Sequence, residues 1–286
     1  MAKLRVLLLC GRSPRHLYVA NALCEAADVL AIVQETGTEW SGKKILRKFR
    51  PDNLLRKTWR WLRDRRRYIG NQEGQFFFGD QTPRLAHPEL VREVPHINHP
   101  EVLRLAREMQ PDLIAVFGTS LLRGELLNEG RLGIVNLHGG LSPEYRGADC
   151  TFWALYNGEP EKIGCTLHYI NAGIDTGKLI AHICPAVQAD DDELTLFWRG
   201  VRESAAAYAE LMHRLAQGEC FGQPQSHQGR LYQVKDRGLR HEQLVEQKLR
   251  AGMLRKLALK TRVNWFIAPS HTGSDQTESN KTGSIE

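Results

Sequence analysis

The sequence predicts an α/β protein with a Rossmann-like, mostly parallel sheet that carries helices on both faces. Short apolar runs rich in Val, Ile and Leu alternate with stretches whose apolar residues recur at helical spacing. This alternation is typical of parallel sheets covered on both sides by helices. The runs expected to be strands are residues 4–10, 29–35, 112–118, 133–139 and 165–170.

The first domain is expected to span residues 1–219. Helical spacing predicts helices over 15–27 and 99–110, between the expected strands. A long amphipathic helix over 192–219 is expected to close the domain, with Gly218 as its stop signal.

A small C-terminal appendage is expected over residues 220–268. Within it, 229–236 is expected to form one arm of a hairpin and 241–260 a last helix. Residues 269–286 are mostly Ser, Thr, Gly, Asn and acids with almost nothing to bury, so we expect a disordered tail.

Length and composition indicate a globular, cytoplasmic protein. The 286 residues suffice for a full hydrophobic core without disulfides or metal. The six cysteines stand singly with no C-x-x-C spacing, which indicates reduced thiols of the cytoplasm. No apolar stretch approaches the roughly eighteen residues of a membrane span, so no transmembrane segment is expected.

A strongly basic excursion is expected at residues 43–67. It contains twelve Lys and Arg residues but only two acidic residues, Asp52 and Asp64, so its local charge excess is +10. Because the net charge of the whole chain is +6, the remainder carries about −4. A solvated helix face is the favoured interpretation. Contact with nucleic acid or an anionic surface is the alternative.

Two polar side chains stand where an expected strand ends. In IVNLHGG, Asn136 and His138 are two residues apart, so they point to the same face and can converge on one ligand. Thirty-seven residues after His138, Asp175 lies between glycines in NAGIDTG. Taken alone, an Asn-x-His pair at a strand end is more often structural than catalytic, and an Asp between glycines is usually a turn residue.

NLHGGLSPEYRG followed by AGIDTG resembles the signature of the folate-dependent formyltransferases. This family includes glycinamide ribonucleotide formyltransferase, methionyl-tRNA formyltransferase and the nucleotide-sugar N-formyltransferases. The resemblance covers roughly residues 85–215 and implies the formyltransferase fold. It also implies that Asn136, His138 and Asp175 are the catalytic trio.

Formyl transfer explains why these residue types are needed. An amine attacks the formyl carbon, and the oxygen becomes an oxyanion that Asn136 and His138 stabilise as donors. Asp175 takes the proton of the amine, directly or through water, and holds His138 in its useful tautomer.

The resemblance further implies 10-formyltetrahydrofolate as co-substrate, without a metal, its pterin held between a strand end and a loop. The residues implied are Phe117, Gly118, Thr119, Ser120, Leu121, Asn171, Ala172 and Ile174. Three of them, Gly118 to Ser120, could instead merely end a strand.

Acceptor-binding residues are expected in two places. The turn after His138 offers Tyr145, Arg146 and Gly147. The first loop, GRSPRH, lacks the glycine pattern of dinucleotide sites, but Arg12, Ser13 and Arg15 could face an anionic group at a helix start. A solvated loop is the other interpretation.

The expected function is formyl transfer to the primary amine of a small acceptor, with an amino sugar on a nucleotide carrier as the favoured choice. The alternatives are a methionyl-tRNA formyltransferase-type enzyme, a formyltetrahydrofolate hydrolase and a catalytically silent binding protein of the same fold. A homodimer is left open.

Overall fold

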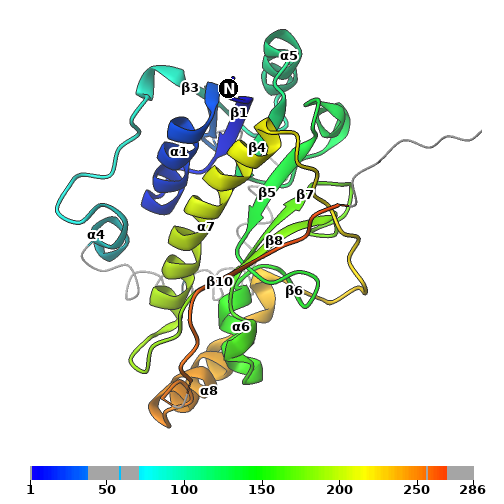
Figure 1. Ribbon diagram of the computed structural model, residues 1–286. Coiled ribbons are helices and arrows are strands. Elements are labelled where there is room, and N and C mark those ends of the chain that lie inside the picture. Colours follow the sequence, from blue (N-terminus) through cyan, green and yellow to red (C-terminus); the bar gives the residue numbers. More distant parts are fainter. Residues whose placement is uncertain (1, 38–57, 59–70, 256, 269–286) are drawn as a thin grey trace, which may run out of the picture.

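The computed structural model describes residues 2–37, 58, 71–255 and 257–268 (Figure 1). Apart from Thr58, the basic excursion 43–67 lies outside the described residues, and so does the tail 269–286. The predictions made for these two segments therefore stay predictions.

The described residues form an eight-stranded sheet that is parallel in one half and antiparallel in the other. In spatial order its strands are β10 (Arg262–Trp265), β8 (Leu179–Cys184), β7 (Cys165–Tyr169), β5 (Ile134–His138), β4 (Leu113–Phe117), β1 (Arg5–Cys10), β2 (Asp28–Glu35) and β3 (Val91–Val94). The pairs from β5 through β4, β1 and β2 to β3 are parallel, whereas β7, β8 and β10 add in antiparallel sense. All five predicted strands are confirmed, and β3, β8 and β10 are strands of this sheet that were not predicted from the sequence.

Both faces of the parallel half are buried, as its continuous apolar strands require. Val6 and Leu8 of β1 pack with helices α1 (Pro14–Ala26) and α7 (Glu193–Ala216), while Leu7 and Leu9 point to the other face, where α5 (Pro100–Met109) covers them. Figure 1 shows α1 and α7 side by side across the sheet, with α4 (Gln72–Phe78) next to them. The predicted mostly parallel α/β fold is thereby confirmed.

The C-terminal segment packs on the first domain through a second cluster of helices. Helices α6 (Cys150–Asn157) and α8 (Leu239–Arg250) share a hydrophobic core. Arg237, whose side chain is fully buried, forms ion pairs with Asp149, Glu193 and Glu242, so one cation joins α6, α7 and α8. The short 3-10 helices are η2 (Pro88–Leu90), η3 (Gly124–Asn128), η4 (Pro160–Lys162) and η5 (Val234–Asp236).

Two local predictions for this segment differ from the structure. Residues 229–236 were expected to form a hairpin arm, but β9 (Arg230–Tyr232) pairs in parallel with the distant β6 (Tyr145–Gly147). The last helix ends at Arg250 rather than at residue 260, and the chain then returns to the main sheet as β10. Three- and four-residue strands carry too short a pattern to reveal partners far away in the sequence.

A buried tyrosine joins the two strands that carry the site. The hydroxyl of Tyr208, on α7, donates to the carbonyl of Val135 at 2.7 Å and accepts from the amide of Val116 at 3.2 Å. We expect Tyr208→Phe to lower the free energy of unfolding by about 1–3 kcal/mol, because two buried backbone groups lose their partner. Urea unfolding measures this change.

Tyr156→Phe is the matched control, since the ring of Tyr156 also packs in an aromatic cluster and would be retained. It is expected to change stability by less than about 0.5 kcal/mol. Equal losses in the two variants would contradict the role assigned to the Tyr208 hydroxyl.

Candidate active site

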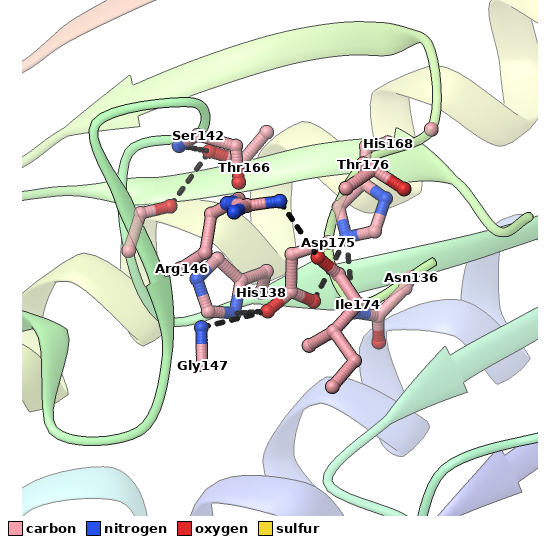
Figure 2. Close-up of polar contacts among 12 residues, drawn as sticks. Asn136, His138, Ser142, Arg146, Gly147, Thr166, His168, Ile174, Asp175 and Thr176 are labelled. Atoms are coloured by element: carbon pink, nitrogen blue, oxygen red, sulfur yellow. Dashed lines mark hydrogen bonds and ion pairs between the residues drawn. The ribbon is translucent and has the colours of Figure 1, made fainter. Parts of the chain in front are cut away.

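The predicted trio meets at the carboxyl end of β5. Strand alternation places Asn136 and His138 on one face, and both point toward Asp175, which lies in the loop between β7 and β8 (Figure 2). Strand β7 lies antiparallel beside β5, with Asn136 opposite His168 and His138 opposite Thr166. Two neighbouring strands and one loop therefore supply the polar cluster.

The Asp175 carboxylate is the centre of this cluster. Its Oδ2 accepts the backbone N–H of Gly147 at 2.9 Å and lies 3.5 Å from Nδ1 of His138, while Oδ1 lies 3.5 Å from Nε2 of His168. Burial alone would raise the pKa of Asp175, but the His168 and His138 rings and the Gly147 amide together lower it to about 2. The carboxylate is therefore ionised throughout the neutral pH range.

The His138 ring is buried and held by a backbone carbonyl. Its Nε2 lies 3.0 Å from the carbonyl oxygen of Tyr145, which can only accept, so the hydrogen-bond network assigns the proton of the neutral ring to Nε2. Nδ1 then faces Asp175 without a proton. Burial lowers the pKa of His138 although Asp175 opposes this, so the neutral ring is the resting form. It can take up a proton at Nδ1, next to an anion that stabilises the resulting imidazolium.

His168 is a member of the cluster that the sequence did not single out. Its side chain is only 3% exposed, its Nδ1 lies 2.8 Å from the carbonyl oxygen of Tyr169, and its Nε2 lies 3.2 Å from the amide nitrogen of Asn136. With the proton on Nδ1, Nε2 accepts from the Asn136 amide and fixes its orientation. Only the register of β7 against β5 could have revealed this residue.

A cavity of about 150 Å³ opens beside the cluster. It is lined by Val116, Thr119, Ser120, Leu121, Leu122, Asn136, His168, Ile170, Gly173 and Asp175. Its walls combine apolar side chains with polar groups from the cluster and from Thr119 and Ser120, a combination found in sites for small organic ligands. Three predicted co-substrate residues, Thr119, Ser120 and Leu121, line it.

Two side chains that do not line the cavity hold the loop that carries these three residues. Glu35 accepts the backbone N–H of Ser120 at 2.6 Å, and the Asn98 amide donates to the carbonyl of Leu121 at 2.9 Å. Phe117 is buried and packs edge-on against His16, with ring centroids 4.8 Å apart. These contacts shape the cavity wall from behind.

Gly118 also shapes the loop. Its φ is 73°, and a Cβ atom there would lie 2.0 Å from the His16 ring. On the opposite side of the cavity, the side-chain oxygen of Asn171 accepts from the N–H of Gly173 and the hydroxyl of Thr176, while Ala172 and Ile174 are exposed. Gly118, Asn171, Ala172 and Ile174, which were expected to contact the co-substrate, are thus beside the cavity rather than among its lining residues.

The residues predicted for the acceptor divide into two groups. Tyr145 and Gly147 contact the trio through their backbone, and the buried guanidinium of Arg146 donates to the carbonyl of Ile174 at 3.4 Å. In the first loop, Arg12 pairs with Glu93 at 2.6 Å and Arg15 with Glu73 at 2.7 Å, and Ser13 precedes α1 as its N-cap residue. None of these first-loop residues lines the cavity.

A larger, open groove of about 750 Å³ lies at the amino ends of β1 and β2, where Lys3, Arg5 and Asp28 line it. It contains none of the predicted catalytic residues. Among the residues that the structure describes, no group of three or more His, Cys, Asp and Glu side chains could hold a metal ion. In the same part of the chain, no helix is long and apolar enough to span a bilayer.

Comparisons with known proteins agree with this geometry. Residues 73–212 match the sequence model of the family described as formyl transferase. Methionyl-tRNA formyltransferase of Caldanaerobacter subterraneus subsp. tengcongensis is 31% identical over 150 residues, which are 52% of this chain and 47% of that protein. The chain thus spans less than half the length of this curated relative.

Solved structures with the same fold cover more of the chain. A sugar N-formyltransferase from a Shewanella species superposes with a TM-score of 0.53 at 14% identity, over 86% of this chain and 87% of that one. Phosphoribosylglycinamide formyltransferase from Anaplasma phagocytophilum gives 0.52 at 18% identity, over 81% and 98%. At these identities the likeness establishes the fold, which is that of the formyltransferases. Together with this fold, the match identifies residues 73–212 as a domain of the formyl transferase family.

Burial of His16 behind the Gly118 loop makes stability depend on pH. Burial lowers the pKa of His16 from 6.5 to about 3, so below pH 6.5 the unfolded chain binds a proton that the folded protein does not. Stability attributable to this group is therefore lost as the pH falls from 6.5 toward 3. Between pH 7 and pH 5 we expect the wild type to lose about 1–2 kcal/mol more than His16→Gln.

Urea unfolding of both proteins at the two pH values measures the difference. His213→Gln is the control, because it makes the same exchange at an exposed position on α7. Parallel pH profiles for the wild type and His16→Gln would show that His16 is not the group responsible.

Proposed function

We propose that this protein transfers a formyl group from 10-formyltetrahydrofolate to the primary amine of a small acceptor, and that it does so in the cytoplasm. The observation that carries the proposal is the convergence of Asn136, His138 and Asp175 beside a cavity lined by both apolar and polar side chains. The match of residues 73–212 to the formyl transferase family supports it independently.

Each member of the trio has a role that follows from its geometry. As the amine nitrogen bonds to the formyl carbon, the carbonyl oxygen gains negative charge, which the Asn136 amide stabilises and which the His138 ring stabilises once Asp175 has passed it the proton of the amine. The amine must lose one proton, and the ionised Asp175 accepts it, directly or through water. When the bond between the formyl carbon and N10 of the folate breaks, that proton goes to N10 by way of the same groups, which leaves a formamide and tetrahydrofolate.

His168 acts on this chemistry through its neighbours. It contacts both the Asn136 amide and the Asp175 carboxylate, so it keeps the donor and the base in fixed positions relative to each other. Because fixed orientation lowers the entropic part of the barrier, we assign His168 a positioning role.

The cavity suits one part of the folate. Leu121 and Ile170 offer apolar surface for a flat heterocycle, and the backbone of the loop at Thr119 to Leu121 offers hydrogen-bonding groups for its edges. A volume of about 150 Å³ is below the roughly 300–1,000 Å³ of a complete ligand site. The cavity therefore takes the ring system, and the remainder of the folate extends along the surface.

For the acceptor, we favour an amino sugar on a nucleotide carrier. The chain aligns along most of its length with a solved sugar N-formyltransferase. Methionyl-tRNA is the second candidate, because relatives that are 31% and 38% identical over part of the chain carry that name. A hydrolase of formyltetrahydrofolate would use the same groups with water as acceptor.

The experiment that tests the proposal measures formyl transfer from 10-formyltetrahydrofolate to a panel of acceptors, with mass spectrometry of the acceptor as readout. The panel contains nucleotide-linked amino sugars, methionyl-tRNA and no acceptor. We expect one amino sugar to gain a formyl group. Transfer to methionyl-tRNA alone would establish the second candidate, and formate release without acceptor would establish the hydrolase.

With the acceptor in hand, His138→Ala and Asp175→Asn are each expected to lower kcat by about a hundredfold or more, because each removes a group needed in the transition state. Asp190→Asn is the matched control, since it makes the same exchange at an exposed site. Circular dichroism checks that the variants are folded. A near wild-type rate in either site variant would remove that residue from the mechanism.

Donor binding can be tested apart from turnover. Isothermal titration with 5-formyltetrahydrofolate, a stable analogue, is expected to show saturable binding. Leu121→Asp places a charge on the apolar cavity wall and should weaken affinity at least about tenfold, equal to about 1.4 kcal/mol. The control is Leu239→Asp, which changes another exposed leucine, on α8. Equal affinities in the two variants would contradict this placement of the folate.

A further inference from the structure

The loop that carries Asp175 holds this residue in an unusual backbone conformation. The φ angle of Asp175 is 51°, in the left-handed region that non-glycine residues seldom adopt. Such a conformation persists only where the surroundings hold it. The contacts between Asn171 and Thr176 hold the first part of the loop, so the second part needs a separate support.

That support comes from a segment that follows the first domain. Residues 223–232 run along the site, and we call them the strap. At one end, Gln223 and Leu179 exchange two backbone hydrogen bonds of 2.8 and 2.9 Å. At the other end, Arg230–Tyr232 pairs with Tyr145–Gly147, the strand whose Gly147 amide donates to Asp175.

Between these two ends, the strap contacts the catalytic loop through one side chain. The Nε2 of Gln225 donates to the carbonyl oxygens of Asp175 and Gly177, each at 2.9 Å. A primary amide carries two N–H groups, so both hydrogens have an acceptor in the loop. Together they fix the peptide groups on the C-terminal side of Asp175, and with them the direction of its side chain.

The strap also lies close to the loop before β6. A Cβ atom on Gly229 would come within 1.7 Å of the carbonyl oxygen of Pro143, and Arg146 donates to the carbonyl of Gly229 at 2.9 Å. The strap therefore bridges the two segments that hold the Asp175 carboxylate and its backbone. All of it lies beyond residue 212, where the match to the formyl transferase family ends.

We propose that Gln225 is a positioning residue for Asp175: it holds the backbone of the loop so that the carboxylate faces His138 and His168. The proposal rests on the function proposed above, in which Asp175 accepts a proton. Gln225 does not touch the reacting atoms, and its effect comes through Asp175. Because small displacements of a catalytic group lower rates strongly, loss of these two hydrogen bonds is expected to lower kcat rather than donor affinity.

Two variants remove the donors while keeping the length of the side chain. Gln225→Glu replaces the amide by a carboxylate that repels both carbonyls, and Gln225→Met removes the polar atoms without adding charge. Gln228→Glu is the matched control, because Gln228 is exposed on the same strap and the charge change is identical. Circular dichroism and thermal unfolding establish that all three variants are folded.

The first measurement is steady-state kinetics with the acceptor that the panel experiment identifies. Both Gln225 variants are expected to lower kcat by about tenfold or more, with the KM for the folate donor within about threefold of wild type. Gln228→Glu is expected to retain the wild-type kcat. If both Gln225 variants have the kcat of the control, the proposal is wrong.

The second measurement needs no activity. In ¹H–¹⁵N spectra of the imidazole nitrogens at neutral pH, both Gln225 variants should shift the His138 and His168 signals, and Gln228→Glu should not. Unchanged signals would overturn the proposal even if kcat fell, because Asp175 would not have moved relative to the rings. Absence of any formyl transfer by the wild type would instead contradict the proposed function, and the spectra would still decide the role of Gln225.

Discussion

The ionised carboxylate of Asp175, enclosed by the Gly147 N–H and two imidazole rings, makes the contacts on which the candidate active site depends. Burying a carboxylate is costly unless hydrogen bonds and charges compensate for the lost water. Here the Gly147 amide donates to the carboxylate, and the His138 and His168 rings can each take up a proton beside it; the three groups come from three separate segments of the chain. The turn after β5, the register of β7 and the loop before β8 must all be correct for the carboxylate to be tolerated. The contacts that stabilise the carboxylate therefore also require these three segments of the site to come together.

Local sequence patterns were sufficient for the half of the site that lies on one strand. Asn136 and His138 could be placed together because alternation on a strand is a local rule, and the glycines after them mark the strand end. Asp175 could be added only by resemblance, since no local rule joins a turn residue to a strand 37 positions earlier. His168 was missed because its place opposite Asn136 depends on the antiparallel pairing of two strands. The sequence of residues 165–170 does not reveal this pairing.

The fold was predictable to a similar extent and for the same reason. The five predicted strands and the helices α1, α5 and α7 each carry enough residues for a period to be recognised, and they were placed within a few residues of their observed ends, whereas the last helix was predicted ten residues too long. Strands β6, β9 and β10 have three or four residues, and their partners lie far away in the sequence. Their formation depends on tertiary packing, as does the position of α8, which the buried Arg237 joins to α6 and α7 through ion pairs. Propensity alone cannot reveal such elements.

The parallel pairing of β6 with β9 has a consequence for the time at which the site forms during synthesis. Tyr145–Gly147 leaves the ribosome more than eighty residues before Arg230–Tyr232, its only partner among the described strands. At about 5–20 residues per second, several seconds or more separate the two events. Through this interval the sheet can pair from β1 to β8, while the segment that donates the Gly147 amide to Asp175 lacks its neighbour. The candidate active site thus receives this neighbouring strand only after strands β1 to β8 have been synthesised.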